Sequence, residues 1–267
     1  MGTRAANAPR VDEAAATTTY EQPLSERMRT FLRLEFLAQQ ANHHSLQESP
    51  WSSRAAVDSL LEILTILGRG DIRGEVLKEL ERQQSILAPF GSRPGVDTSR
   101  LEALLNRVAS LRGALAEVGA HYVQPLKDSE FLSAIKHRSA IPGGTCEFDL
   151  PDFKHWLGLP YERRAEDFRL WLASIKPLCD SVSQLLWLAR ESGEESGQVA
   201  HHGLFQHSLA KGTSCQLLRI TVDHAMAVYP EVSGSHHRFT VRFLSWVGIA
   251  DRPAQVTGDV DFVLSVC

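Results

Sequence analysis

The spacing of the hydrophobic residues changes once along this chain, and that change restricts the fold. From about residue 23 to residue 191, apolar residues recur every three or four positions, as in Leu24, Met28 and Phe31. This spacing predicts amphipathic α-helices, whereas beyond residue 200 the period becomes two, which predicts half-buried strands. A run of helices followed by a run of strands indicates an α+β protein, with a mainly helical domain followed by a small antiparallel β-rich domain.

The alternation in the last third is regular enough to predict which residues face the core. The expected inward-facing series are Leu218, Ile220 and Val222, then Phe239, Val241 and Phe243, and finally Val260, Phe262, Leu264 and Val266. Polar residues occupy most of the positions between them, as expected for antiparallel strands with one buried and one exposed face.

Shifts in composition suggest where the domains begin and end. The segment from Glu191 to Gly197 is polar and contains two glycines, which is typical of a linker. Proline and paired glycines at residues 141–144 must end a helix. We therefore expect a disordered tail at 1–20, a helical domain at 21–142 and 150–191, a β-rich domain at 143–149 and 200–267, and a linker at 192–199.

Several residues predict individual helix ends. Asp71 and Asp97 precede helical segments and are good N-caps, because a carboxylate accepts hydrogen bonds from the first free N–H groups. Gly68 is expected to end a helix in the left-handed conformation. Residues 146–148 form a short segment that we interpret as a strand, and Pro151 is expected in the first turn of a short helix.

The charge balance argues against wholesale binding to nucleic acid or to an anionic membrane. The 267 residues include 28 Lys and Arg against 32 Asp and Glu, for a net charge of −4, and such binding usually requires a basic chain. No run approaches the ~20 apolar residues of a membrane-spanning helix. The four cysteines are scattered without a Cys-x-x-Cys pair, which favours a cytoplasmic protein.

The sequence gives no support to catalysis, a metal or a cofactor. It contains no Gly-x-Ser-x-Gly, His-Glu-x-x-His, Walker or Gly-x-Gly-x-x-Gly motif. Six of its 11 histidines follow residue 200, which leaves a metal-dependent enzyme as an alternative. However, His201–His202 and His236–His237 are adjacent pairs whose rings point in opposite directions on an extended chain, unlike most zinc ligands.

Exposed arginines are the strongest sign of a binding function. Arg238 and Arg242 fall on one side of an alternating strand, about 13 Å apart at the usual rise per residue. Arg29 and Arg33 lie one turn apart on a helix. Guanidinium groups bind carboxylates in a bidentate manner, so an acidic peptide is a natural ligand. A nucleic-acid-binding regulator using the same arginines is an alternative, although a basic tail and interleaved aromatic residues are missing.

Seven short blocks along the chain resemble one protein family. They are Pro23–Leu37 (PLSERMRTFLRLEFL), Leu77–Gln84 (LKELERQQ), Pro94–Arg100 (PGVDTSR), Ile141–Gly144 (IPGG), Phe148–Pro151 (FDLP), Tyr229–Gly234 (YPEVSG) and Arg238–Phe243 (RFTVRF). In order and position they resemble the Z-ring-associated ZapD family of proteobacterial division proteins, from about residue 20 to the end.

The resemblance implies a function that the composition does not show. Members of this family are non-enzymatic, cytoplasmic homodimers that bind the C-terminal tail of the division GTPase FtsZ through a basic surface. They cross-link FtsZ filaments into bundles at the midcell division ring. Nucleic acid and membrane insertion are not expected. The resemblance implies the tail-binding residues Arg29, Arg33, Arg69, Lys154, Arg238 and Arg242. Glu130 stands where some relatives carry a basic residue, which removes one charge from the expected surface.

Overall fold

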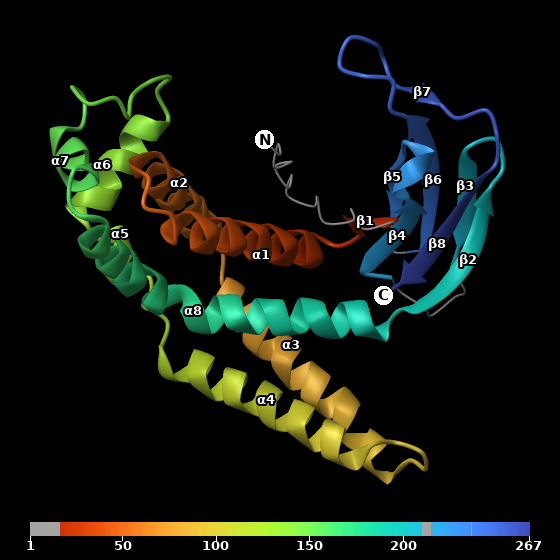
Figure 1. Ribbon diagram of the computed structural model, residues 1–267. Coiled ribbons are helices and arrows are strands. Elements are labelled where there is room, and N and C mark those ends of the chain that lie inside the picture. The colour runs from red at the N-terminus through yellow and green to blue at the C-terminus, as the bar shows by residue number, and fades with distance from the viewer. Residues whose placement is uncertain (1–16, 210–214, 236) are drawn as a thin grey trace, which may run out of the picture. The chain divides into compact units, whose positions relative to one another are not determined.

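The computed structural model describes residues 17–209, 215–235 and 237–267. By contacts the chain divides into two units. We call Met1–Arg29 with Ala189–Cys267 the sandwich unit, and Thr30–Leu188 the helical unit. The α+β class is confirmed, because α-helices dominate the first part of the chain and antiparallel strands the last part (Figure 1).

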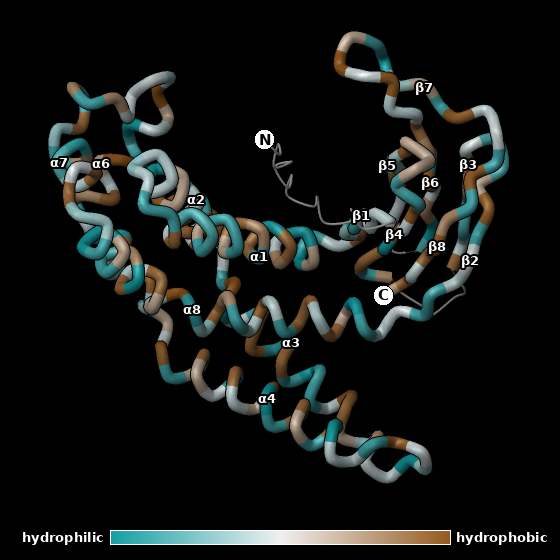
Figure 2. Tube along the Cα trace, in the orientation of Figure 1, coloured by the Kyte–Doolittle hydropathy of each residue, from teal (hydrophilic) through white to brown (hydrophobic). Residues whose placement is uncertain are grey.

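The helices have the following bounds: α1 Glu26–Ser45, α2 Pro50–Leu67, α3 Ile72–Leu87, α4 Thr98–Glu117, α5 Gln124–Lys127, α6 Glu130–Ser139, α7 Pro151–Leu157 and α8 Tyr161–Ser192. Short 3₁₀ helices cover Ala88–Ser92 and His224–Met226. Hydrophilic and hydrophobic residues are interleaved along α1, α4 and α8, as expected for helices with one buried face (Figure 2).

The predicted N-caps are confirmed. The Asp71 carboxylate accepts a hydrogen bond from the Gly74 N–H at 2.9 Å, and Asp97 accepts one from the Arg100 N–H at 3.1 Å. The prediction for Gly68 is wrong, because its φ of −82° is right-handed. Its N–H donates to the Leu64 carbonyl at 3.0 Å, so α2 ends without the left-handed turn.

Aromatic rings fill part of the helical unit. The rings of Phe131 and Phe153 are 5.9 Å apart in an edge-to-face arrangement, and Trp156 lies 5.6 Å from Trp171. The Trp156 indole N–H donates to Asp167 at 3.0 Å, so its polar atom is satisfied. Such contacts fix α6, α7 and α8 together through offset and edge-to-face ring packing.

The sandwich unit consists of two antiparallel sheets. The strands are β1 Thr17–Pro23, β2 Glu194–Ala200, β3 Leu204–Ser208, β4 Leu217–Asp223, β5 Val228–Ser235, β6 Arg238–Ser245, β7 Ala254–Gln255 and β8 Val260–Val266. One sheet has the order β1-β4-β8-β2 and the other the order β3-β6-β5, with β7 paired to β6.

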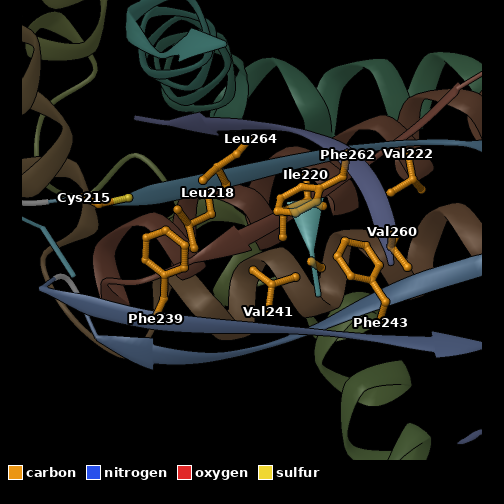
Figure 3. Close-up of a cluster of buried hydrophobic side chains, with 11 residues drawn as sticks. Cys215, Leu218, Ile220, Val222, Phe239, Val241, Phe243, Val260, Phe262 and Leu264 are labelled. Carbon is orange, nitrogen blue, oxygen red and sulfur yellow. The ribbon is translucent and has the colours of Figure 1, made fainter. Parts of the chain in front are cut away.

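The alternating apolar residues form the core between these sheets, as predicted. Phe239, Val241 and Phe243 of β6 point from one sheet toward side chains of β4 and β8 on the other (Figure 3). Each of these three residues is at most 1% exposed. Val266 is only partly buried, at the edge of the cluster.

Two of the expected boundaries are wrong at strands of the first sheet. Residues 17–20 were expected in the tail, but they belong to β1, which pairs with β4 from Thr17 opposite Asp223. Threonine and tyrosine suit a strand although they are polar enough to suggest a tail. Residues 194–199, expected in the linker, belong to β2, which pairs with β8. Residues 1–16 lie outside the described residues.

The expected strand at 146–148 and the assignment of 143–149 to the β-rich domain are also wrong. This segment lies in the helical unit and forms successive turns. Gly143 has a φ of +72°, and the N–H of Cys146 donates to its carbonyl at 3.0 Å. In these turns, backbone N–H and C=O groups bond within the segment, so they are not available to pair with a neighbouring strand.

Two further observations concern the described part of the chain alone. None of its helices combines the length and the apolar composition that crossing a bilayer requires. Within the same residues, no three His, Cys, Asp or Glu side chains converge as a metal site would need.

Candidate partner-binding surfaces

The six predicted binding residues are divided between the two units. Arg29, Arg238 and Arg242 belong to the sandwich unit, and Arg33, Arg69 and Lys154 belong to the helical unit.

Arg238 and Arg242 share the outer face of β6. The residues between them alternate, so that Phe239 and Val241 enter the core while both arginines are exposed. Within the pairing register, Ser208 of β3 and Ser235 of β5 flank Arg238. This part of the face is therefore polar, and among the described residues no carboxylate forms an ion pair with Arg238.

Arg242 differs from Arg238, because β5 places Glu231 directly opposite it. The guanidinium Nη2 donates to the Glu231 Oε2. The two side chains are 50% and 51% exposed, so water screens the pair and its contribution to stability is small. The pair nevertheless engages the Nη2 group of Arg242, a residue that was expected to bind a partner.

The two arginines of α1 also differ. The Nε of Arg29 lies 3.3 Å from the Glu26 Oε1, one turn earlier on the helix. Arg33 is exposed, and within residues 17–209, 215–235 and 237–267 it has no ion-pair partner. Of this pair, Arg33 therefore has the more available charge.

Lys154 lies on α7, and its Nζ is 2.6 Å from the Glu147 Oε2. The hydrogen bond from Lys154 and its charge lower the pKa of the Glu147 carboxyl. Both side chains are exposed, so a partner carboxylate could bind Lys154 only in competition with Glu147.

Arg69 lies between α2 and α3, beside a hollow of about 430 Å³ in the helical unit. The residues that line this hollow come from α2, α5 and α6 and from the segment that follows α2. They are Leu61, Leu64, Thr65, Gly68, Arg69, Leu126, Lys127, Leu132, Ser133, Lys136 and His137. We call it the α2–α6 groove. Its floor is apolar and its rim carries Arg69, Lys127, Lys136 and His137.

Lys127, Lys136 and His137 were missed by the sequence reasoning. Lys136 and His137 occupy the last turn of α6, where basic residues are common because they complement the helix dipole. Lys127 ends a four-residue helix that has no amphipathic signal. The only available sign was a run of basic residues at 136–138, which the helix dipole explains equally well. Glu130, at the start of α6, does not line the groove.

Two of the four thiols, those of Cys179 and Cys215, do not have the character of nucleophiles. Burial raises the pKa of the Cys179 thiol to about 12 and that of Cys215 to about 11. Both are therefore protonated at neutral pH, whereas reactive cysteines are thiolates in electropositive, accessible sites. The Nδ1 of His201, in the turn between β2 and β3, lies 3.0 Å from the Oδ2 of Asp259, just before β8, and both side chains are exposed.

Comparison with known proteins identifies the same family along most of the chain. The family model described as ZapD, a cell division protein, matches residues 32–242. The chain is also similar to the cell division protein ZapD of Methylococcus capsulatus. The two are 38% identical over 248 residues, which cover 93% of this chain and 97% of the relative.

Proposed function

The chain belongs to the ZapD family of cell division proteins, and we propose that it binds the C-terminal tail of FtsZ and cross-links FtsZ filaments into bundles. In this proposal it acts in the cytoplasm at the midcell ring, where it promotes assembly and stability of the ring. The observation that carries the proposal is a set of exposed cations without carboxylate partners among the described residues, namely Arg33, Arg69 and Arg238. The chain as a whole has a net charge of −4, so these cations are local exceptions to its overall charge.

Cross-linking requires two tail sites in one assembly. One protomer that holds one tail cannot join two filaments, whereas a twofold dimer presents two equivalent sites. Once one site is occupied, the second binds at a high effective concentration, so modest affinities suffice along neighbouring filaments. We therefore propose that the protein acts as a homodimer.

We also propose that the protein is not an enzyme. The raised pKa values of Cys179 and Cys215 leave these thiols protonated. The side chains of the hydrogen-bonded pair His201 and Asp259 are both exposed. In this view its activity is to position FtsZ filaments.

Co-sedimentation with GTP-assembled FtsZ tests the proposal directly. We expect the purified protein to pellet with thick bundles of full-length FtsZ and to stay in the supernatant when FtsZ lacks its C-terminal tail. Pelleting that survives removal of the tail would keep the partner but reject the tail as its binding site. Absence of pelleting at low salt would reject the proposal, and a gel shift would then test the nucleic-acid alternative.

A charge reversal tests the contribution of the sandwich unit. The variant Arg238→Glu with Arg242→Glu is expected to fold and dimerise normally but to lose filament bundling, since both residues are exposed on β6. A matched control is Arg100→Glu with Arg107→Glu on α4, which changes the net charge equally at two exposed positions. Normal bundling by the β6 variant would remove these residues from the site.

A further inference from the structure

The α2–α6 groove combines an apolar floor with a cationic rim. Leu61 and Leu64 of α2, Leu126 of α5 and Leu132 of α6 are buried residues that reach its surface. These helices lie close together in the helical unit (Figure 1). The volume of about 430 Å³ is within the range of ~300–1,000 Å³ that is usual for ligand pockets. The floor therefore offers space for apolar side chains of a ligand.

The charges on the rim are all of one sign. Arg69, Lys127 and Lys136 are cations with His137 beside them, all four side chains are exposed, and no Asp or Glu lines the groove. In the described part of the chain none of these four side chains forms an ion pair. By contrast, Arg138, the next residue after His137, is paired with Asp149 at 3.4 Å.

The nearest carboxylates belong to neighbouring features. Asp58 and Glu62 line an adjacent hollow that shares Leu61, Thr65 and Lys136 with the groove. Asp128 follows Lys127, and its Oδ1 accepts a hydrogen bond from the Gln124 side chain at 2.7 Å. None of these acids lines the groove itself.

We propose that the α2–α6 groove is a docking site for an acidic peptide segment in which carboxylates flank an aliphatic side chain. The carboxylates would bind the rim formed by Arg69, Lys127 and Lys136, and the aliphatic side chain would cover the leucine floor. The inference rests on the proposed function, because the segment it assigns to the groove is part of the FtsZ tail. Charge complementarity selects an acidic ligand, and the floor selects one that also buries apolar surface.

The lining makes this ligand a better fit than the alternatives. A nucleic-acid backbone would pair with the cations, but the lining contains no Phe, Tyr or Trp, and His137 is its one ring on which a base could stack. A small inorganic anion would leave the four leucines uncovered. A peptide with both acidic and aliphatic residues uses both parts of the groove.

The test is the binding of a fluorescein-labelled peptide, the C-terminal tail of FtsZ from the same bacterium, to the full-length protein by fluorescence anisotropy. We expect Lys127→Glu with Lys136→Glu to weaken binding at least tenfold, because two attractive charges become repulsive. The Arg100→Glu with Arg107→Glu variant has the same net charge and keeps the groove, so its affinity should stay within about twofold of wild type. Circular dichroism and urea unfolding would establish that both variants fold.

A second variant tests the apolar floor separately. Thr65 lines the groove, and among the described residues its hydroxyl donates just one hydrogen bond, to the Leu61 carbonyl of its own helix at 2.8 Å. Thr65→Leu therefore preserves α2, since leucine is a better helix former, while it fills the groove. We expect at least threefold weaker binding at unchanged charge. Binding unchanged by Thr65→Leu would overturn the docking groove and leave only a basic surface.

Failure of this inference differs from failure of the proposed function. If wild type binds the tail and the Lys127→Glu, Lys136→Glu variant binds it equally well, the groove is not the site, whereas the function stands. If wild type does not bind the tail, both are overturned. A loss confined to the two groove variants supports both.

Discussion

The two units of this protein differ in what they bury. The sandwich unit encloses an apolar cluster that includes Phe239, Phe243 and Phe262, and no charged residue belongs to this described cluster. The helical unit buries Glu79 and Arg164 among its apolar side chains. A sheet interior made by alternation excludes charge at every second residue, whereas helices that meet at several angles leave positions where a long polar side chain can reach a partner.

Within each unit, some exposed cations are already paired and others are not. In the sandwich unit, Arg242 is paired with Glu231, whereas Arg238 has no carboxylate partner in the described residues. In the helical unit, Lys154 is paired with Glu147 and Arg138 with Asp149, whereas the rim of the α2–α6 groove has no carboxylate partner in the described residues. An arginine at an expected position is therefore insufficient evidence for a site, because its existing partner decides how much charge a ligand can use.

The largest expected effect concerns the apolar interior of the sandwich. Phe239→Ala should lower the free energy of unfolding by about 3–5 kcal/mol, because it removes a buried ring and leaves a cavity between the sheets. Phe239 is 1% exposed. Urea unfolding followed by fluorescence measures the change. Phe148→Ala is the matched control, since this ring is 86% exposed and its loss should change stability by less than about 0.5 kcal/mol. Equal effects of the two substitutions would contradict the core assignment.

A smaller effect is expected for the buried charge of the helical unit. Arg164 donates to the Ser53 hydroxyl at 2.7 Å and to the Glu48 carbonyl at 2.6 Å, so it fixes the start of α2 to α8. Arg164→Met should cost about 2–3 kcal/mol, because both acceptors lose a charge-assisted donor. Arg163→Met, at the exposed neighbouring position, should be nearly neutral.

The same urea experiment can also reject this interpretation of Arg164. Buried charges are sometimes replaced by apolar residues without loss of stability. If Arg164→Met is as stable as wild type, the guanidinium would be tolerated by the helical unit and would not stabilise it. The buried charge would then distinguish the composition of the helical unit from that of the sandwich core without contributing to stability.

A third prediction concerns the start of a helix in the helical unit. Asp97→Ala should lower the free energy of unfolding by about 1 kcal/mol, since the Arg100 N–H loses its acceptor at the start of α4. Asp97→Asn retains an acceptor oxygen and should remain within a few tenths of a kcal/mol of wild type. If both variants lose the same stability, the carboxylate charge would matter more than the cap.

The sequence predicted the sandwich core well because strand alternation depends only on neighbouring residues. It missed β1, because Thr17–Pro23 is a polar edge strand whose identity depends on pairing with β4, about 200 residues later. It also missed the α2–α6 groove. Arg69, Lys127 and Lys136 come together only when three helices pack, and no local period reports such packing.

The register of the sheet likewise determines which predicted cation is available. Glu231 precedes Arg242 by 11 residues, and only the pairing of β5 with β6 places the two opposite each other. Read along the chain, Arg238 and Arg242 are equivalent. In the sheet, serines flank one and a carboxylate neutralises the other.

The smallest expected effect on stability makes this difference testable. Glu231→Gln removes the carboxylate beside Arg242 and should change the free energy of unfolding by less than about 0.5 kcal/mol, because the pair is half exposed. If Arg242 binds an acidic segment, the loss of its ion pair with Glu231 should tighten binding of the FtsZ tail peptide about two- to threefold at low salt. This gain in affinity should shrink at higher salt, because salt screens the charges. Combining Glu231→Gln with Arg242→Gln supplies the control, because the gain requires the free guanidinium. Unchanged binding by Glu231→Gln would indicate that the tail does not contact Arg242. The cations of the helical unit would then be the main candidates for binding the tail.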